Sequence, residues 1–350
     1  MIAAGGTAGH VVPALAVAEA LRAEGVEVAF IGGARAEAQL VPAAGFELHT
    51  IAVEPLSRAS PVRAARALRL AAAAVPRARA MLAALAPQAV MGGGGYVAGP
   101  VALAALTLRV PVVLTEADSR MGLSNRLLAP FARRVCLAFP PSSRRRPPAR
   151  YRVTGRPMFG PAHERDGARA RFGIGASDTC VLVFGGSLGA RSINMAAVEA
   201  FARASFRVLH VCGARDYEGL ARRELRAGYQ LHEQLDPAAF GDALAASDLV
   251  VARAGGSVFE IAAHGLPAIL IPYARAAGDH QSANARWMTE AGAAVAIADR
   301  DLSPARLAGE VAGLLADRAR LARMAAAARS VARPDAARAV ARELLEAGRA

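Results

Sequence analysis

Residues 248–284 read DLVVARAGGSVFEIAAHGLPAILIPYARAAGDHQSAN, and this stretch decides the fold class of the chain. It opens with the apolar run Leu249–Val251, which is typical of a strand buried in a parallel sheet. A glycine pair then precedes Ser257, and Glu260 follows three residues later, a spacing that predicts a capping box and a helix start at Ser257. Because a glycine and a proline end that helix and residues 268–271 predict another strand, the stretch is a βαβ unit.

The glycine-rich turn of this unit lies at the carboxyl end of its first strand, where open α/β sheets bind ligands and a helix N-terminus favours anions. Two interpretations of its polar residues stay open. Glu260 either binds a ligand or only caps the helix, and Arg253 either contacts an anion or only projects into solvent.

Length and composition exclude several kinds of site. A chain of 350 residues is long enough for two domains, and its net charge is +13. The chain has no lysine, which excludes a P-loop lysine, a Schiff-base lysine and a pyridoxal-phosphate anchor. The charge suits nucleic acid, anionic lipid or a diphosphate substrate as partner, unless it only reflects an Ala- and Arg-rich composition.

Cysteine usage and hydropathy predict a cytosolic protein without a membrane span. Cys136, Cys180 and Cys212 are too widely spaced for a disulfide framework or a zinc site. The first residues lack the basic region of a signal peptide. Val97–Leu114 is the most apolar stretch, but proline and arginine interrupt it, so any membrane contact is expected from the surface.

Residues 61–85 predict an Ala-rich helix that Pro76 divides. Arginines beside an apolar stripe are typical of a helix at a membrane interface, and an ordinary solvated helix face is the alternative. These arginines are Arg58, Arg63, Arg66, Arg69, Arg77 and Arg79. No aromatic residue accompanies them for base stacking, so a nucleic-acid surface is not expected.

Strands and helices alternate through both halves of the chain. Predicted strands cover residues 1–4, 26–31, 46–51, 88–91, 110–114 and 135–139, which closes the first half, and then 180–184, 207–212, 249–251 and 268–271. Predicted helices cover residues 34–44, 61–85, 97–108, 191–204, 237–246, 281–291 and 334–350, with others starting near Pro13 and ended by Gly25, and starting at Gly122 and Ser257. This order predicts an α/β protein of two doubly wound parallel sheets facing each other across a cleft.

Three more strand-to-helix turns carry a ligand-binding signal. GGTAGH at 5–10 holds His10, which either contacts substrate or is structural. Gly92–Gly95 leave backbone amides open to a ligand at the end of another strand. Gly185–Ala190 form a tight turn whose free N–H groups and following helix can face a diphosphate.

In chain order, these segments resemble the MurG family of bacterial peptidoglycan glycosyltransferases (glycosyltransferase family 28) over nearly the whole chain. The similar segments are GGTAGH at 5–10, GGGGYVAGP at 92–100, LSNR at 123–126, GGSLGA at 185–190, ARAGGSVFEIAAHGLPAILIPY at 252–273 and HQSANA at 280–285. The resemblance implies a GT-B fold, with an acceptor- and membrane-contacting domain over 1–155 and a UDP-sugar domain over 156–333. It also implies that the helix over 334–350 packs back on the first domain.

The activity that the resemblance implies is inverting transfer of N-acetylglucosamine from UDP-N-acetylglucosamine to lipid-linked muramoyl-pentapeptide, lipid I to lipid II, in peptidoglycan synthesis. The expected partners are these two substrates and an anionic surface at the cytoplasmic face of the membrane, with no nucleic acid. Three alternatives remain. They are a related GT-B enzyme with another lipid or small-molecule acceptor, a GT-B-like sugar-nucleotide epimerase, and a non-catalytic basic protein that binds lipid or nucleic acid.

Carried over residue by residue, the resemblance implies that His10 is the general base on the acceptor hydroxyl, with Glu116 as a second catalytic residue. Glu260 would bind the ribose hydroxyls, and Leu235 would meet the uracil. The donor-binding residues implied are Thr7, Ala8, Gly9, Arg156, Ser187, Leu188, Leu235, Arg253, Gly256, Ser257, Glu260, His280, Gln281 and Asn284. Those implied at the acceptor are Tyr96, Asp118 and Asn125.

The chain departs from the family pattern at several of these positions. Ala8 stands for a glycine, Leu188 for a glutamine, and Thr115–Asp118 for the sequence His-Glu-Gln-Asn. Phe159 stands for an arginine expected near the diphosphate, and Arg156 is the candidate to replace that arginine.

No essential metal or other cofactor is expected. Metal-dependent glycosyltransferases hold the ion through an Asp-x-Asp pair, and the matching triplet here is Asp299–Asp301. It lies outside the motifs and just before a helix near Ser303, where helix capping is the favoured interpretation. Backbone amides and arginine are expected to hold the leaving diphosphate.

Overall fold

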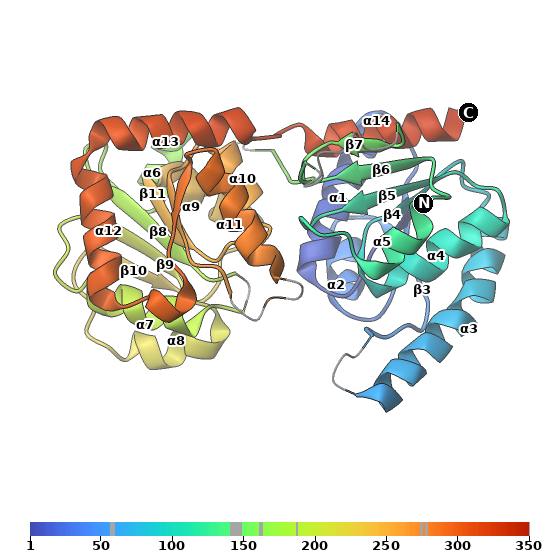
Figure 1. The fold of residues 1–350 in the computed structure, drawn as a ribbon, viewed down its shortest axis with the longest axis horizontal. Helices are drawn as coiled ribbons and strands as arrows, with labels where there is room; N and C mark the ends of the chain where they lie inside the picture. Colours follow the sequence, from blue (N-terminus) through green and yellow to red (C-terminus); the bar gives the residue numbers. More distant parts are fainter. Residues whose placement is uncertain are drawn as a thin grey trace. The chain divides into compact units, whose positions relative to one another are not determined.

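The computed structural model describes residues 1–56, 60–140, 149–160, 164–186, 188–273, 276 and 279–349. The chain forms two compact units, and Figure 1 labels most of their helices and strands. Unit 1 comprises Met1–Gly160 and Arg333–Ala350, and unit 2 comprises Pro161–Ala332.

Seven of the described strands form one parallel sheet in unit 1, in the order β3-β2-β1-β4-β5-β6-β7. They are β1 (Ile2–Ala3), β2 (Ala29–Gly32), β3 (Glu47–Thr50), β4 (Val90–Gly92), β5 (Val112–Glu116), β6 (Arg134–Leu137) and β7 (Tyr151–Val153). The order reverses between β1 and β4, which pair with Ile2 opposite Met91. Such a switch point opens a crevice at the carboxyl ends of the strands, so it brings the turns after β1 and β4 to one place.

Helices cover the sheet of unit 1 through two apolar cores. The helices are α1 (Ala8–Ala23), α2 (Ala36–Ala43), α3 (Pro61–Leu85), α4 (Gly95–Thr107), α5 (Leu123–Leu128) and α14 (Ala336–Arg349). Val11 of α1 and Val340 and Leu344 of α14 share one core, and α3 and α4 supply the other. The last described helix of the chain therefore packs on unit 1, where its Glu343 also pairs with Arg134 at 2.8 Å.

Six of the described strands form a second parallel sheet in unit 2, in the order β10-β9-β8-β11-β12-β13. They are β8 (Cys180–Phe184), β9 (Arg207–Val211), β10 (Tyr229–His232), β11 (Leu249–Ala252), β12 (Ala268–Leu270) and β13 (Ala294–Ala296). The helical elements are α6 (Arg165–Arg171), α7 (Arg191–Ala200), α8 (Ala214–Ala221), α9 (Pro237–Ala246), α10 (Val258–Ala263), α11 (His280–Glu290), the 3-10 turn η2 (Asp299–Asp301), α12 (Pro304–Ala316) and α13 (Arg318–Val331). Strand order reverses between β8 and β11, which places the turns after these strands at the ligand-binding edge.

The predicted α/β class with two doubly wound parallel sheets is confirmed, and two predictions about the elements of unit 1 are wrong. The strand predicted at 135–139 does not close the first sheet, because the short edge strand β7 pairs beyond it. Pro76 does not divide the long helix: α3 runs from Pro61 to Leu85. A proline removes one helical N–H bond, but buried Ala74, Ala78 and Leu82 keep this helix packed on both sides of Pro76's turn. Among the described helices, none is long and apolar enough to cross a membrane.

Candidate functional site

His10 lies between the two glycine-rich turns at the switch point of unit 1. It is in the first turn of α1, directly after the turn that follows β1, and its Nδ1 lies 3.2 Å from Thr7 Oγ1. Its ring packs against Gly94, where an added β-carbon would lie 2.8 Å from His10 Cδ2. Only glycine therefore leaves room for the imidazole at this place.

Burial lowers the pKa of His10, and the positive charge of Arg156 adds to this effect. The negative charges of Asp118 and Glu37 act in the opposite direction. Arg156 itself donates from Nη2 to the carbonyl oxygen of Gly9 at 2.5 Å, so it is fixed beside the first turn of α1. A neutral imidazole in this setting can accept a proton at neutral pH.

The predicted acceptor residues Glu116, Asp118 and Asn125 form one cluster after β5. Glu116 Oε2 accepts hydrogen bonds from Gly122 N–H at 2.7 Å and from Asn125 Nδ2 at 3.0 Å, and its Oε1 accepts one from Asp118 N–H at 3.2 Å. Asn125 Nδ2 also donates to the carbonyl oxygen of Thr115 at 2.9 Å. Burial raises the pKa of Glu116, and these three donors oppose the rise. With both oxygens engaged, the carboxylate orders the loop that precedes α5.

Tyr96 contacts the first glycine turn, where an added β-carbon on Gly6 would lie 2.9 Å from its ring. The guanidinium of Arg35 lies 5.9 Å from the centre of that ring. Sequence reasoning missed the residue beside them, Glu37, which is fully buried and accepts a hydrogen bond from Gly6 N–H. The signal that could have found it is a single carboxylate in the first turn of α2, which follows the strand next to β1.

In unit 2, Arg253 directly follows β11 and is buried. Its Nη1 donates to Asp299 Oδ1 at 2.7 Å and to the carbonyl oxygen of Ile271 at 3.1 Å, and its Nη2 donates to Ser192 Oγ at 2.8 Å. The ring of Tyr273 lies 5.4 Å from the guanidinium. The interpretation that Arg253 only projects into solvent is therefore wrong. Its buried guanidinium links the turn after β11, where Arg253 lies, to the turn after β12, where Ile271 lies.

The capping box predicted at Ser257 is not formed. Helix α10 begins at Val258, and Ser257 has helical backbone angles, φ −62° and ψ −12°, with no capping hydrogen bond from its side chain. An N-cap residue needs an extended backbone to aim its oxygen at the first free N–H groups. Gly256, Ser257 and Glu260 are half-buried on this turn at the carboxyl end of β11.

Asn284 and Gln281 of α11, which are predicted to bind the donor substrate, also hold this helix at the carboxyl edge of the unit 2 sheet. Asn284 is almost fully buried and donates from Nδ2 to the carbonyl oxygen of Ala254 at 3.0 Å. Its Oδ1 is buried without a hydrogen-bond partner among the described residues, so it can accept from a bound ligand. Gln281 Oε1 accepts from Tyr273 N–H at 2.9 Å, and His280 begins the helix.

The remaining donor candidates lie at the ends of neighbouring strands. Leu188 follows β8 with its side chain exposed, and Leu235 follows β10 and is half-buried before the N-cap Asp236 of α9. Ser187 lies outside the described residues. The unit 1 residues assigned to the donor, which are Thr7, Ala8, Gly9 and Arg156, surround His10.

Asp299 does not cap α12, contrary to the favoured sequence interpretation. Ser303 is the cap and accepts from Arg306 N–H at 3.2 Å, while Asp299 Oδ1 accepts from Arg253 and from Ser192 Oγ at 2.7 Å. Over the described part of the chain, no three His, Cys, Asp or Glu side chains are grouped as metal ligands.

Comparison with known proteins matches both units to the same protein family. A model of the glycosyltransferase family 28 N-terminal domain matches residues 1–137, and a model of the family 28 C-terminal domain matches residues 180–340. A protein of Moorella thermoacetica is 41% identical over 99% of this chain and 98% of its own length. One of Sorangium cellulosum is 42% identical over 100% of this chain and 88% of its own length. Both are named UDP-N-acetylglucosamine–N-acetylmuramyl-(pentapeptide) pyrophosphoryl-undecaprenol N-acetylglucosamine transferase.

Among solved structures, MurG of Acinetobacter baumannii aligns over 99% of this chain and 98% of its own, with a TM-score of 0.79 and 30% identity. The UDP-N-acetylglucosamine 2-epimerase of Neisseria meningitidis aligns over 99% of both chains with a TM-score of 0.71, but at 14% identity this shows a shared fold alone. Both family models, the relatives and the two Rossmann-like parallel sheets thus agree that this chain belongs to glycosyltransferase family 28 and has the GT-B fold.

Proposed function

We propose that this glycosyltransferase moves N-acetylglucosamine from UDP-N-acetylglucosamine onto lipid-linked muramoyl-pentapeptide, converting lipid I to lipid II in peptidoglycan synthesis. The names of relatives aligned over nearly the whole chain support these substrates. The structural observation that carries the proposal is the placement of His10 between the turns after β1 and β4, with a lowered pKa. An acceptor hydroxyl needs a base of this kind before it can attack.

In the proposed mechanism, His10 accepts the proton of the acceptor hydroxyl. If Nδ1–H donates to Thr7 Oγ1, Nε2 carries the free lone pair, which fixes the tautomer needed for a general base. The hydroxyl oxygen bonds to the anomeric carbon of the donor sugar from the face opposite UDP, the bond from that carbon to the diphosphate oxygen breaks, and the electron pair leaves with UDP. The configuration at the anomeric carbon is thereby inverted.

The turns of unit 2 are proposed to bind the donor, with Glu260 on the ribose hydroxyls, Leu235 at the uracil, and Gln281 and Asn284 at the sugar. The buried, unpartnered Oδ1 of Asn284 supports its part of this assignment. The amides of the turn after β8 are proposed to stabilise the negative charge that grows on UDP, since they precede the N-terminus of α7.

We further propose that no essential metal takes part in the reaction. The candidate metal-binding triplet Asp299–Asp301 supports this proposal, because the Oδ1 atom of Asp299 already accepts hydrogen bonds from Arg253 and Ser192. Transfer in excess EDTA should proceed as fast as transfer with Mg²⁺. Loss of activity in EDTA that divalent metal restores would contradict the metal-free mechanism.

The decisive assay for the function is transfer from UDP-N-acetylglucosamine to a short-chain lipid-linked muramoyl-pentapeptide, with the mass of the product measured. A mass gain of one N-acetylhexosamine supports the proposal. The alternative is a related GT-B enzyme with another acceptor, which Asp118 favours because it lies in the acceptor cluster where the family pattern has asparagine. UDP-N-acetylglucosamine binding without transfer to this acceptor would support that alternative.

Contact with the cytoplasmic face of the membrane is proposed through α3, a peripheral association. Val62 and Leu68 expose 80% and 62% of their surface beside the exposed Arg63 and Arg69. Arg66 pairs with Glu54 at 2.9 Å while still largely exposed. Apolar and cationic groups on one helix suit an anionic lipid surface. Arg58 of the predicted interfacial segment lies outside the described residues.

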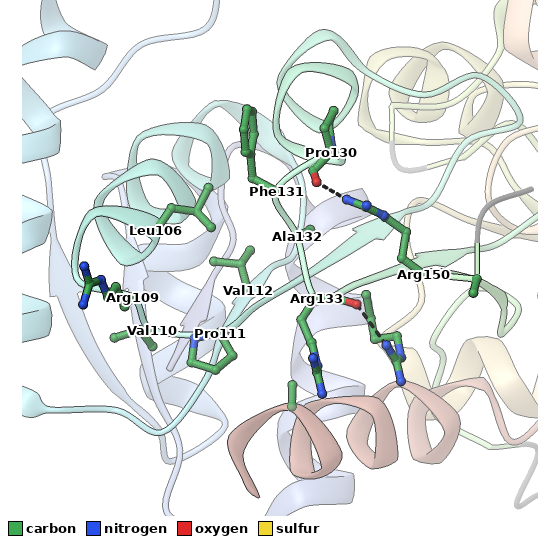
Figure 2. Close-up of a pocket in the computed structure, with 13 residues that line it drawn as sticks. Leu106, Arg109, Val110, Pro111, Val112, Pro130, Phe131, Ala132, Arg133 and Arg150 are labelled. Atoms are coloured by element: carbon green, nitrogen blue, oxygen red, sulfur yellow. Dashed lines mark hydrogen bonds between the residues drawn. The ribbon is translucent and has the colours of Figure 1, made fainter. Parts of the chain in front are cut away.

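A pocket of about 640 Å³ extends this proposal to the amino-terminal edge of the unit 1 sheet (Figure 2). It lies where β5, β6 and β7 begin, so it is remote from the turns that hold His10. Arg109, Arg133 and Arg150 line it, together with Phe131, whose surface is 70% exposed. Cationic side chains around an exposed aromatic ring fit a lipid headgroup above an acyl boundary.

Sedimentation with anionic vesicles tests the α3 contribution. Each arginine near an anionic surface contributes about 1 kcal/mol, so reversing three charges should weaken binding by at least about two orders of magnitude at low salt. The variant reverses Arg63, Arg66 and Arg69. The matched control reverses three exposed arginines of α13 in unit 2, Arg318, Arg320 and Arg323. Equal binding to neutral vesicles would contradict the electrostatic part of the proposal.

A further inference from the structure

Glu37 ties together the turns that follow two adjacent strands of unit 1. Its side chain is fully buried in the first turn of α2. Oε2 accepts a hydrogen bond from Gly6 N–H at 2.8 Å, and Oε1 accepts one from Gly33 N–H at 2.8 Å. Gly6 follows β1 and Gly33 follows β2, and these strands pair in the sheet. We propose that Glu37 is a positioning residue for glycosyl transfer, because it holds the turn that carries His10.

The backbone of the first glycine turn packs closely against the Glu37 carboxylate. A β-carbon added to Gly5 would lie 2.6 Å from Glu37 Oε1, so the turn can approach this closely only with glycine there. A buried carboxylate is costly unless donors compensate it, and here two backbone N–H groups do so, one to each oxygen. Glutamine offers one oxygen only, so its amide group would face one of these N–H donors. Aspartate keeps both oxygens but is one methylene shorter.

The charge of Glu37 also acts on His10. Burial and Arg156 lower the pKa of His10, while Asp118 and Glu37 raise it. Removing the Glu37 charge should therefore lower the pKa of His10 further. If His10 is the general base of the proposed function, on which this step rests, the acid limb of the pH–rate profile moves to lower pH.

Two substitutions separate the hydrogen bonds from the charge. Glu37→Asp keeps the charge and loses reach, so kcat should fall about 10-fold with the acid limb unmoved. Glu37→Gln loses the charge, so kcat should fall and the acid limb should move to lower pH. The KM for UDP-N-acetylglucosamine should change less than kcat in both, since the residues proposed to bind the ribose, the uracil and the sugar belong to unit 2. The matched control is Glu27→Gln, at an exposed glutamate in the same unit, which should change none of these quantities.

The assay is lipid II formation by the full chain from pH 5 to 9, with circular dichroism and thermal melting of each variant. Wild-type kcat in both Glu37 variants would overturn the inference, and so would a loss of activity matched by a lower melting temperature and a raised donor KM. If Glu37→Gln does not fold, the kcat of Glu37→Asp decides alone. A wild-type profile without an acid limb would overturn His10 as the base, and the kcat of Glu37→Asp would still test positioning.

Discussion

Asp299 offers a direct test of whether the acidic triplet of unit 2 serves the structure or a metal. Its Oδ1 accepts from Arg253 and Ser192, and the side chains of Arg253 and Asp299 are 10% and 23% exposed. Asp299→Asn keeps an acceptor but loses its charge, and Asp299→Ala leaves the buried guanidinium without its counter-charge. Asp301, in the same triplet, is exposed and pairs only loosely with Arg300 at 3.7 Å, so Asp301→Asn is the matched control.

The expected magnitudes follow from burial. Breaking a fully buried ion pair costs about 3–5 kcal/mol, and this pair is partly exposed, so Asp299→Ala should cost about 2–3 kcal/mol. Asp299→Asn loses only the charge-assisted part of two hydrogen bonds, about 1 kcal/mol. For a domain of this size, each kcal/mol lowers the melting temperature by about 2–4 °C, so we expect losses of about 4–12 °C for Ala and 2–4 °C for Asn. Asp301→Asn should melt like the wild type.

The measurements are thermal melting in EDTA and transfer rate against Mg²⁺ concentration. If Asp299 and Arg253 form a structural ion pair, only the Asp299 variants should melt at a lower temperature. The transfer rate of every variant should then be independent of Mg²⁺. The reasoning is refuted if Asp299→Asn and Asp301→Asn both melt like the wild type yet lose activity that high Mg²⁺ restores.

Three further predictions concern single residues. His10→Ala should lower kcat by about 10²–10⁴ with donor affinity nearly unchanged; normal turnover would direct attention to Glu116. Glu260→Gln should weaken a charge-assisted bond to the donor by about 1.5–3 kcal/mol, and so raise KM for UDP-N-acetylglucosamine by at least about 10-fold at an unchanged melting temperature; a lower melting temperature at unchanged KM would mark it as structural. His210 is buried between Tyr229 and Asn194, and burial lowers its pKa to about 4. His210 is neutral in the folded protein and gains a proton on unfolding below about pH 6.5. Its contribution to the free energy of unfolding is therefore complete at pH 7. This contribution is lost progressively as the pH falls towards 4, to a total of about 3 kcal/mol. Urea midpoints that fall as steeply with pH in His210→Gln as in the wild type would contradict this.

The sequence predicts elements best where an apolar run is bounded by strong end signals. Cys180–Phe184 and Pro237–Ala246 have the predicted bounds, the latter because a proline follows the capping Asp236. Edge strand β7, Tyr151–Val153, escaped prediction because its exposed side chains give no apolar run. Elements were also missed where arginine-rich composition hides the periodicity, as in α13.

The sequence indicates which residues lie in strand-to-helix turns, but it does not indicate which of them contact each other across the sheet. The glycines of the turn that ends at His10 indicate this turn in the sequence. The bond from Glu37 to Gly6 spans 31 positions, and the bond from Arg253 to Asp299 spans 46. Such pairs depend on which strands are neighbours, and local spacing does not contain that information. The capping box at Ser257 had the right spacing but failed, because a capping serine needs an extended backbone and Ser257 is helical.

The return of α14 to unit 1 has a consequence for the order in which the protein can be completed on the ribosome. The chain leaves unit 1 after Gly160 and comes back only at Arg333, so all of unit 2 is synthesised in between. At about 5–20 residues per second, this takes on the order of ten to thirty seconds. During that time the apolar face of unit 1 that Val340 and Leu344 will cover stays uncovered, until α14 has been synthesised.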